Sequence, residues 1–133
     1  MDWIRDTLQE FGRQIGMGQL EFNRHGLLQL SFPSGGFLAV EPSQPGAPEE
    51  VLVYMGRPVG HRAAGLLRTA LTRAHAVDGG APFVQVGLRG DGPDAALIAL
   101  ARLAERSFTP QTLSMTVQYL DRWLDEVQAE KTK

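Results

Sequence analysis

Apolar residues recur at helical spacing in the middle of the chain, between positions 61 and 77. On a wheel of about 100° per residue they fill an arc of roughly 160°. The arc is made by Ala63, Ala64, Leu66, Leu67, Ala70, Leu71, Ala74 and Val77. A single packing layer needs a stripe of only about 100°, and small alanines let another backbone approach closely. The pattern predicts a helix that packs on its own sheet and on a second subunit, although a helix buried more deeply in a monomer fits the same periodicity.

Two further helices are predicted near the ends of the chain. Residues 2–15 carry one narrow apolar stripe, formed by Ile4, Leu8, Phe11 and Ile15. Trp3 lies off this stripe, either as an anchor in the core or on the rim of a docking surface. The last helix is expected to begin at Pro110 after the N-cap Thr109. Its stripe consists of Leu113, Val117, Leu120, Leu124 and Val127.

Alternating apolar and polar residues predict short β-strands between these helices. The first two strands lie at 19–23 and 28–32, joined by a turn at 23–26, and a third at 37–41 follows a turn at 33–36. An apolar strand at 51–55 follows the proline-rich loop 42–48, and another strand at 83–89 follows the central helix. The first connections are too short for parallel crossovers, so we expect an antiparallel meander.

The segment 95–105 supports two interpretations. Its sequence, AALIALARLAE, favours a helix on intrinsic propensity. Its length and its position after the glycine-rich turn 90–94 favour a strand paired back on 83–89. Composition alone predicts a helix here.

Length and composition limit the class of protein. The chain has 133 residues, of which 43% are hydrophobic and 21% charged, and it contains no cysteine. These values fit a single globular domain over residues 1–133 without a disulfide or a thiolate site. We expect no signal peptide and no transmembrane segment. The net charge of −2, without a basic aromatic face, argues against a nucleic-acid partner.

No constellation of residues indicates catalysis or metal binding. His25, His61 and His75 are not spaced with carboxylates as ligands, and the serines lack the context of a nucleophile elbow. Asp121, Asp125 and Glu126 read as a solvated face of the last helix. The sequence therefore predicts neither an enzyme nor a cofactor.

The order of elements and several short segments resemble the class I chaperones of type III secretion, which have the CesT/SycE-like fold, and among them the SycN type. The residues that carry this resemblance are the start Met1-Asp2-Trp3-Ile4 with Phe11, His61-Arg62 opening the central helix, Ala70-Leu71 inside it, and Glu105-Arg106-Ser107 with Leu113. The resemblance implies an α+β fold in the order helix, antiparallel β meander, central helix, β hairpin and C-terminal helix. It also implies that 95–105 is a strand.

The resemblance further implies a function. Such chaperones bind the N-terminal region of a secreted effector in extended form and keep it competent for export without ATP. They dimerise through the central helix and the strand after it. A SycN-type chain is expected to pair with a YscB-like chaperone and to bind a YopN-like gatekeeper, although a homodimer is also considered. The expected location is the bacterial cytoplasm, or the periphery of the secretion apparatus at the inner membrane.

Two sets of surface residues are predicted from the amphipathic patterns. Cargo is expected to contact Trp3, Leu8, Phe11, Leu28, Leu30 and Phe32. The dimer interface is expected to contain Leu66, Leu67, Ala70, Ala74, Val84 and Val86. Simple core packing is the alternative for each cargo residue.

Two other functions fit the patterns: a small α+β ligand-binding or enzymatic domain with a pocket between sheet and helices, and a structural subunit of an assembly.

Overall fold

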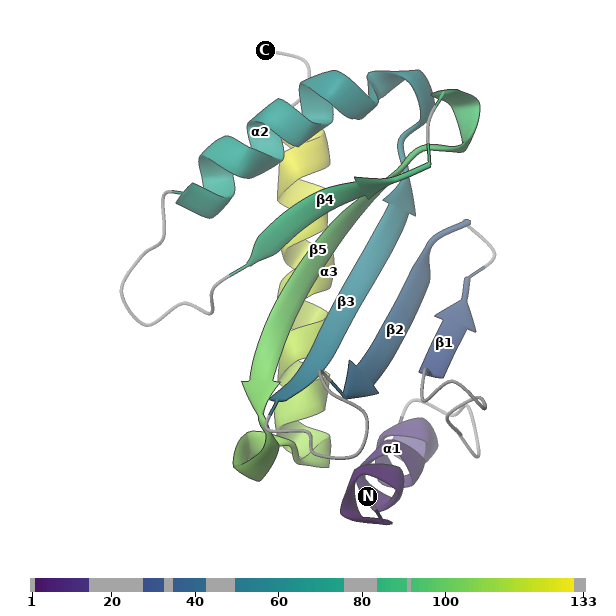
Figure 1. The fold of residues 1–133 in the computed structure, drawn as a ribbon, viewed down its shortest axis with the longest axis vertical. Helices are drawn as coiled ribbons and strands as arrows, with labels where there is room; N and C mark the ends of the chain where they lie inside the picture. Colours follow the sequence, from purple (N-terminus) through teal and green to yellow (C-terminus); the bar gives the residue numbers. More distant parts are fainter. Residues whose placement is uncertain are drawn as a thin grey trace.

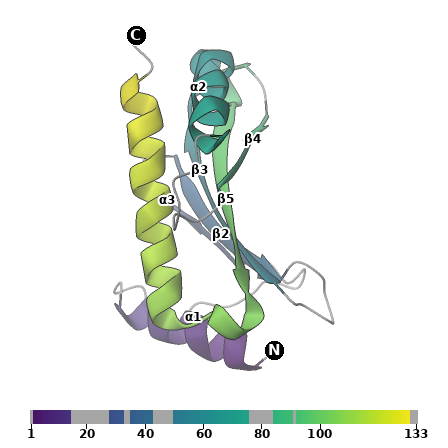
Figure 2. The ribbon, with the colours of Figure 1, turned by 90° about the vertical axis from the view of Figure 1, so that its left-hand side faces the viewer.

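A computed structural model describes residues 2–14, 28–32, 35–42, 50–75, 84–90 and 92–130. In these residues a five-stranded antiparallel sheet is combined with three α-helices (Figures 1 and 2). One large apolar core joins side chains of all three helices to one face of the sheet. This is the α+β class that the sequence predicts.

The strands follow the order β1-β2-β3-β5-β4 across the sheet. Strands β1 (Leu28–Ser31), β2 (Phe37–Pro42) and β3 (Glu50–Pro58) form the predicted antiparallel meander. Strand β3 continues past the predicted end at 55, because its last residues pair with the start of β5. The strand predicted at 19–23 and the turn after it lie outside the described residues.

The segment of ambiguous propensity is strand β5 (Ala96–Ala104). It pairs along its whole length with β3, and residues 96–100 also pair with β4 (Gln85–Arg89) on the other edge. Leu97, Ala99 and Ala101 are buried on the helix-covered face. The helix favoured by composition is therefore wrong, since pairing on both sides outweighs an intrinsic preference of a few tenths of a kcal/mol per residue. The strand implied by the family resemblance is confirmed.

The helices cover one face of the sheet and begin where the sequence signals predict. Helix α3 (Pro110–Glu130) begins after Thr109, whose Oγ1 accepts a hydrogen bond from the backbone N–H of Thr112 at 3.1 Å. Helix α1 (Asp2–Gln14) packs near the start of α3. Helix α2 (Ala63–His75) follows a short 3₁₀ turn, Gly60–Arg62, and lies beside β4 and α3.

The opposite face of the sheet carries a smaller apolar cluster. Phe37, Ala39 and Tyr54 are buried there, and the two aromatic rings meet edge-on with centroids 6.3 Å apart. The guanidinium carbon of Arg89 lies 4.5 Å from the centroid of the Phe37 ring, and the Tyr54 hydroxyl donates to Glu41 at 3.3 Å. Burial, and secondarily the charge of Glu41, raise the pKa of Tyr54. Tyr54 therefore stays neutral and keeps donating to Glu41.

Candidate functional site

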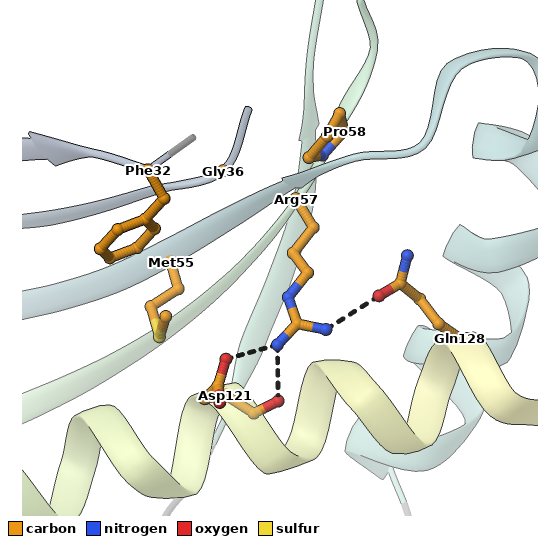
Figure 3. Close-up of a pocket in the computed structure, with 7 residues that line it drawn as sticks. All are labelled: Phe32, Gly36, Met55, Arg57, Pro58, Asp121 and Gln128. Carbon is orange, nitrogen blue, oxygen red and sulfur yellow. Dashed lines mark hydrogen bonds and ion pairs between the residues drawn. The ribbon is translucent and has the colours of Figure 1, made fainter. Parts of the chain in front are cut away.

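A hollow of about 370 Å³ opens between the sheet and helix α3. We call it the α3 groove, and it is lined by Phe32, Gly36, Met55, Arg57, Pro58, Asp121 and Gln128 (Figure 3). Its size is near the lower end of the range for ligand pockets, about 300–1,000 Å³. The lining comes from three places: the end of the β1–β2 hairpin, the second half of β3, and the last turns of α3. The groove is thus a product of tertiary packing.

The apolar half of the groove is built by alternation along the strands. Leu30 and Phe32 point to the helix-covered face, because Leu30 pairs with Leu38 and both face the core. Phe32 remains 36% exposed, while Met55 beneath it is buried. Figure 3 shows these two side chains next to each other on one side of the groove, with Arg57 on the other side. A large apolar side chain from another molecule would gain contact with both.

The polar half is organised by Arg57, which reaches from β3 to α3. Its Nη1 donates to Gln128 Oε1 at 2.9 Å and also bonds the Asp125 carboxylate. Its Nη2 donates to the backbone carbonyl of Asp121 at 3.0 Å and bonds the carboxylate of the same residue. The Arg57 side chain is only 20% exposed, whereas both aspartates are more than half exposed. Arg57 therefore fixes the distance between the sheet and α3.

The arrangement of the two aspartates explains why this arginine matters. Asp121 and Asp125 are one helical turn apart on the same face of α3, and like charges at this spacing repel each other by a few tenths of a kcal/mol. A guanidinium between them converts this repulsion into two charge-assisted bonds. Among the described residues, Arg57 is the basic partner that both carboxylates share.

We expect Arg57→Met to lower the free energy of unfolding by about 1–2 kcal/mol, because it removes the bonds between β3 and α3 while keeping the aliphatic stem. Urea unfolding followed by circular dichroism measures the change. Arg13→Met is the matched control, since the Arg13–Glu10 pair lies on the surface of one helix and should be worth no more than about 0.5 kcal/mol. Equal losses of unfolding free energy in the two variants would contradict the proposal that Arg57 holds α3 against the sheet.

One edge of the sheet lies beside the groove. Among the described strands, β1 has a neighbour on one side only, as does β4 at the other end of the sheet (Figure 1). A strand in that position presents backbone N–H and C=O groups that can pair with another chain. Because Leu30 and Phe32 belong to β1 and its continuation, this edge of the described sheet lies next to the apolar half of the groove.

The predicted cargo residues divide into three groups. Leu8, Phe11 and Leu28 are buried in the main core of the chain, so they do not form a surface in this conformation. Leu30 is half-buried and Phe32 is exposed, and the cargo prediction therefore rests on these two. Trp3 belongs to α1, but its side chain lies outside the described residues.

The predicted dimer residues divide in a similar way. Leu66, Ala70 and Val84 are buried in the core of the chain itself. Leu67, Ala74 and Val86 are half-buried, on α2 and β4. Two exposed residues that the prediction omitted extend this surface: Leu71, which is 51% exposed, and Leu88, which is 40% exposed.

Sequence reasoning missed the polar half of the groove entirely. The sequence patterns place Arg57 after the apolar strand 51–55, and Asp121 and Asp125 on a solvated helix face. The available signal was the unfavourable spacing of the two aspartates on one face, which calls for a cation between them. Among the described residues, no group of histidines and carboxylates is placed to hold a metal ion.

Comparison with known proteins identifies the family. The model of the type III secretory system chaperone SycN matches residues 3–128. The chain belongs to the SycN family of type III secretion chaperones. No curated protein sequence matches this chaperone significantly. The alternative interpretation as an enzymatic or ligand-binding domain is not supported by the family or the fold.

Solved structures of other secretion chaperones share the fold. The chaperone SycH of Yersinia pestis, solved with a stable fragment of YscM2, is 14% identical, with a TM-score of 0.68 over 93% of this chain and 98% of that one. The HopA1–SchA chaperone–effector complex gives 19% identity and a TM-score of 0.65, covering 96% and 94% of the two chains. The ExsC–ExsE complex gives 16% identity and a TM-score of 0.65, covering 97% and 91%.

Within the part of this chaperone that the structure describes, no helix is long and apolar enough to cross a membrane.

Proposed function

We propose that this chaperone holds the N-terminal region of a secreted protein in extended form along the α3 groove and along the edge of β1 that has no neighbour among the described strands. The observation that carries the proposal is the exposed Phe32 ring above Met55, next to a strand with one unpaired edge among the described strands. Membership of the SycN family supports it. So does the fold shared with SchA, a chaperone solved in a chaperone–effector complex.

The binding energy is proposed to come from two sources. An extended cargo segment pairs its backbone with β1 and places alternate side chains on the groove side. Each large apolar side chain that it buries contributes about 1.5–3 kcal/mol, while ordering the segment costs several kcal/mol. Because the ordering cost offsets part of the contact energy, the complex can form and separate without ATP. An export chaperone needs this property.

We further propose that a second subunit covers the surface formed by Leu67, Leu71, Val86 and Leu88 on α2 and β4. These residues form a half-exposed apolar surface at the edge of the sheet. We propose a different chain, a YscB-like chaperone, as this second subunit, because the chain belongs to the SycN family and the SycN-type resemblance implies such a pair.

The family resemblance suggests the remaining partners. We propose a YopN-like gatekeeper as the cargo of the heterodimer. The complex is proposed to act in the bacterial cytoplasm and to deliver its cargo to the secretion apparatus at the inner membrane.

We expect Phe32→Ser to weaken cargo binding about tenfold, because the cargo loses one large apolar contact worth about 1–2 kcal/mol. The measurement is the calorimetric Kd for the N-terminal region of a YopN-like gatekeeper, with the chaperone purified alone or with its partner subunit. Phe32 is exposed at the end of β1, so the fold should survive.

Met115→Ser is the matched control, since Met115 is a 62% exposed apolar residue on α3 that does not line the groove. It should leave the Kd unchanged. Unchanged affinity in Phe32→Ser, with the fold intact, would rule out the groove as the cargo site.

A further inference from the structure

We infer that the α3 groove selects cargo segments in which a lysine or arginine lies close to a large apolar residue, an inference that rests on the proposed function. The groove places the apolar surface of Phe32 and Met55 beside the carboxylate of Asp121, and Asp125 shares the Arg57 guanidinium with Asp121. The two halves together define a ligand that is apolar at one side chain and cationic at a neighbouring one.

The hydrogen-bonding capacity that remains in the groove belongs to acceptors. An arginine has five N–H donors, and both terminal nitrogens of Arg57 are already bonded to groups on α3. An ionised carboxylate accepts about four hydrogen bonds, yet each aspartate uses only one oxygen on Arg57. Both side chains are more than half exposed, so their other oxygens are open to an incoming donor. The groove can therefore take an N–H group from cargo more readily than a carboxylate.

The net charge of the groove also favours a basic cargo segment. One guanidinium faces two carboxylates, which leaves the groove with a net negative charge. Helix α3 as a whole carries Asp121, Asp125, Glu126 and Glu130 against the single cation Arg122. A basic segment is attracted to this surface and an acidic segment is repelled. The basic residues of α2 do not cancel the charge at the groove, because Arg73 pairs with Glu126 at 2.6 Å.

The geometry of an extended chain allows one segment to satisfy both halves. Side chains at positions i and i+2 of a strand point the same way and lie about 6.5 Å apart. Lysine and arginine also carry long flexible stems that can lie along apolar surface while the charged head reaches a carboxylate. We therefore place the basic residue one or two positions from the apolar one.

Selection of random peptides displayed on phage against the full-length chaperone tests this inference. The selected peptides should combine a large apolar residue with a nearby lysine or arginine. A selected peptide, labelled with fluorescein, should bind Asp121→Asn about three- to fivefold more weakly than the unmodified protein. Glu126→Gln is the matched control: it removes one negative charge from the same helix, at a residue that pairs with Arg73 and does not line the groove. It should leave peptide affinity unchanged.

Three results would overturn the inference. Selected peptides that are apolar without basic enrichment, and that lose affinity in Phe32→Ser, would leave the proposed function standing and refute the preference for cations. Equal weakening by Asp121→Asn and Glu126→Gln would show that the effect comes from the net charge of the protein and not from the groove. Peptides that bind Phe32→Ser as tightly as the unmodified protein would place binding outside the groove and count against the proposed function as well.

Discussion

Leu71→Glu should prevent this chaperone from pairing with its partner subunit while leaving its own fold intact. Leu71 is 51% exposed on α2 and is not part of the main core, so the substitution costs the monomer little. Pairing would bury the new carboxylate among apolar residues, at a cost of about 3 kcal/mol or more. The Kd of the pair should therefore rise more than 100-fold. The measurement is the light-scattering mass after co-expression with a YscB-like chain, with circular dichroism as the check on folding.

Met115→Glu is the matched control, because it places the same charge on a comparably exposed apolar residue of another helix. The pair should persist in this variant. The chain alone has a mass of 14.5 kDa. A stable species of twice that mass, about 29 kDa, from the chain expressed by itself would contradict the proposed heterodimer. A Leu71→Glu chain that still co-purifies with its partner would show that α2 is not the interface.

The choice of Leu71 illustrates what the sequence could and could not predict about α2. The wide apolar arc correctly predicts a helix that packs on its own sheet, and packing on a second subunit stays a prediction. It does not define which part of the arc faces the sheet, because the rotation of a helix about its axis is set by its neighbours. In the structure Leu66 and Ala70 take the inward position and are at most 1% exposed. Ala70→Glu, a natural choice from the sequence, would unfold the chain and would not report on the interface.

For the predicted cargo residues too, the sequence predicts the apolar stripe but not which of its residues stay exposed. The stripe of α1 is amphipathic, and Leu8 and Phe11 are buried in the core, which is the usual fate of an apolar stripe. Period-two alternation predicts the meander well, since each strand has one face in the core. Which strand residues remain uncovered depends on where helices α1 and α3 end. That information is not local. Among the predicted cargo residues whose side chains are described, only Leu30 and Phe32 remain available at the surface.

The polar half of the groove could not be predicted from the sequence, because it is made by residues far apart in the chain. Arg57 and Asp121 are 64 positions apart, and neither belongs to a recognisable motif. They meet because β3 runs beyond its apolar stretch and because α3 crosses the sheet at that point (Figures 1 and 3). Local propensity fixes the elements, but the pairing of charges between them depends on register and crossing, which a single sequence does not encode in any short pattern.

Gly56→Ala should lower the free energy of unfolding by about 2–3 kcal/mol, although the substitution adds a single methyl group. Gly56 lies in β3 and pairs with Phe37 of β2. A Cβ atom at this position would lie 2.3 Å from Phe37 Cε1, 2.5 Å from Cζ and 2.9 Å from Ile98 Cδ1. The Phe37 ring would have to leave its place, and its contacts with Tyr54 and Arg89 would be lost. Urea unfolding of the purified chaperone measures the loss.

Gly87→Ala tests whether the effect comes from crowding and not from loss of a strand glycine in general. Gly87 lies in β4 with no atom within 4 Å of an added Cβ. An alanine there should be neutral or stabilise the fold by up to about 1 kcal/mol, since alanine restricts the unfolded chain more than glycine does. Similar stability changes in the two variants would contradict the close packing of Phe37 over Gly56. Destabilisation by Gly56→Ala together with stabilisation by Gly87→Ala would show that the sheet face carrying Phe37 and Tyr54 is a packed layer in its own right. Only a tightly held ring would resist one methyl group so strongly.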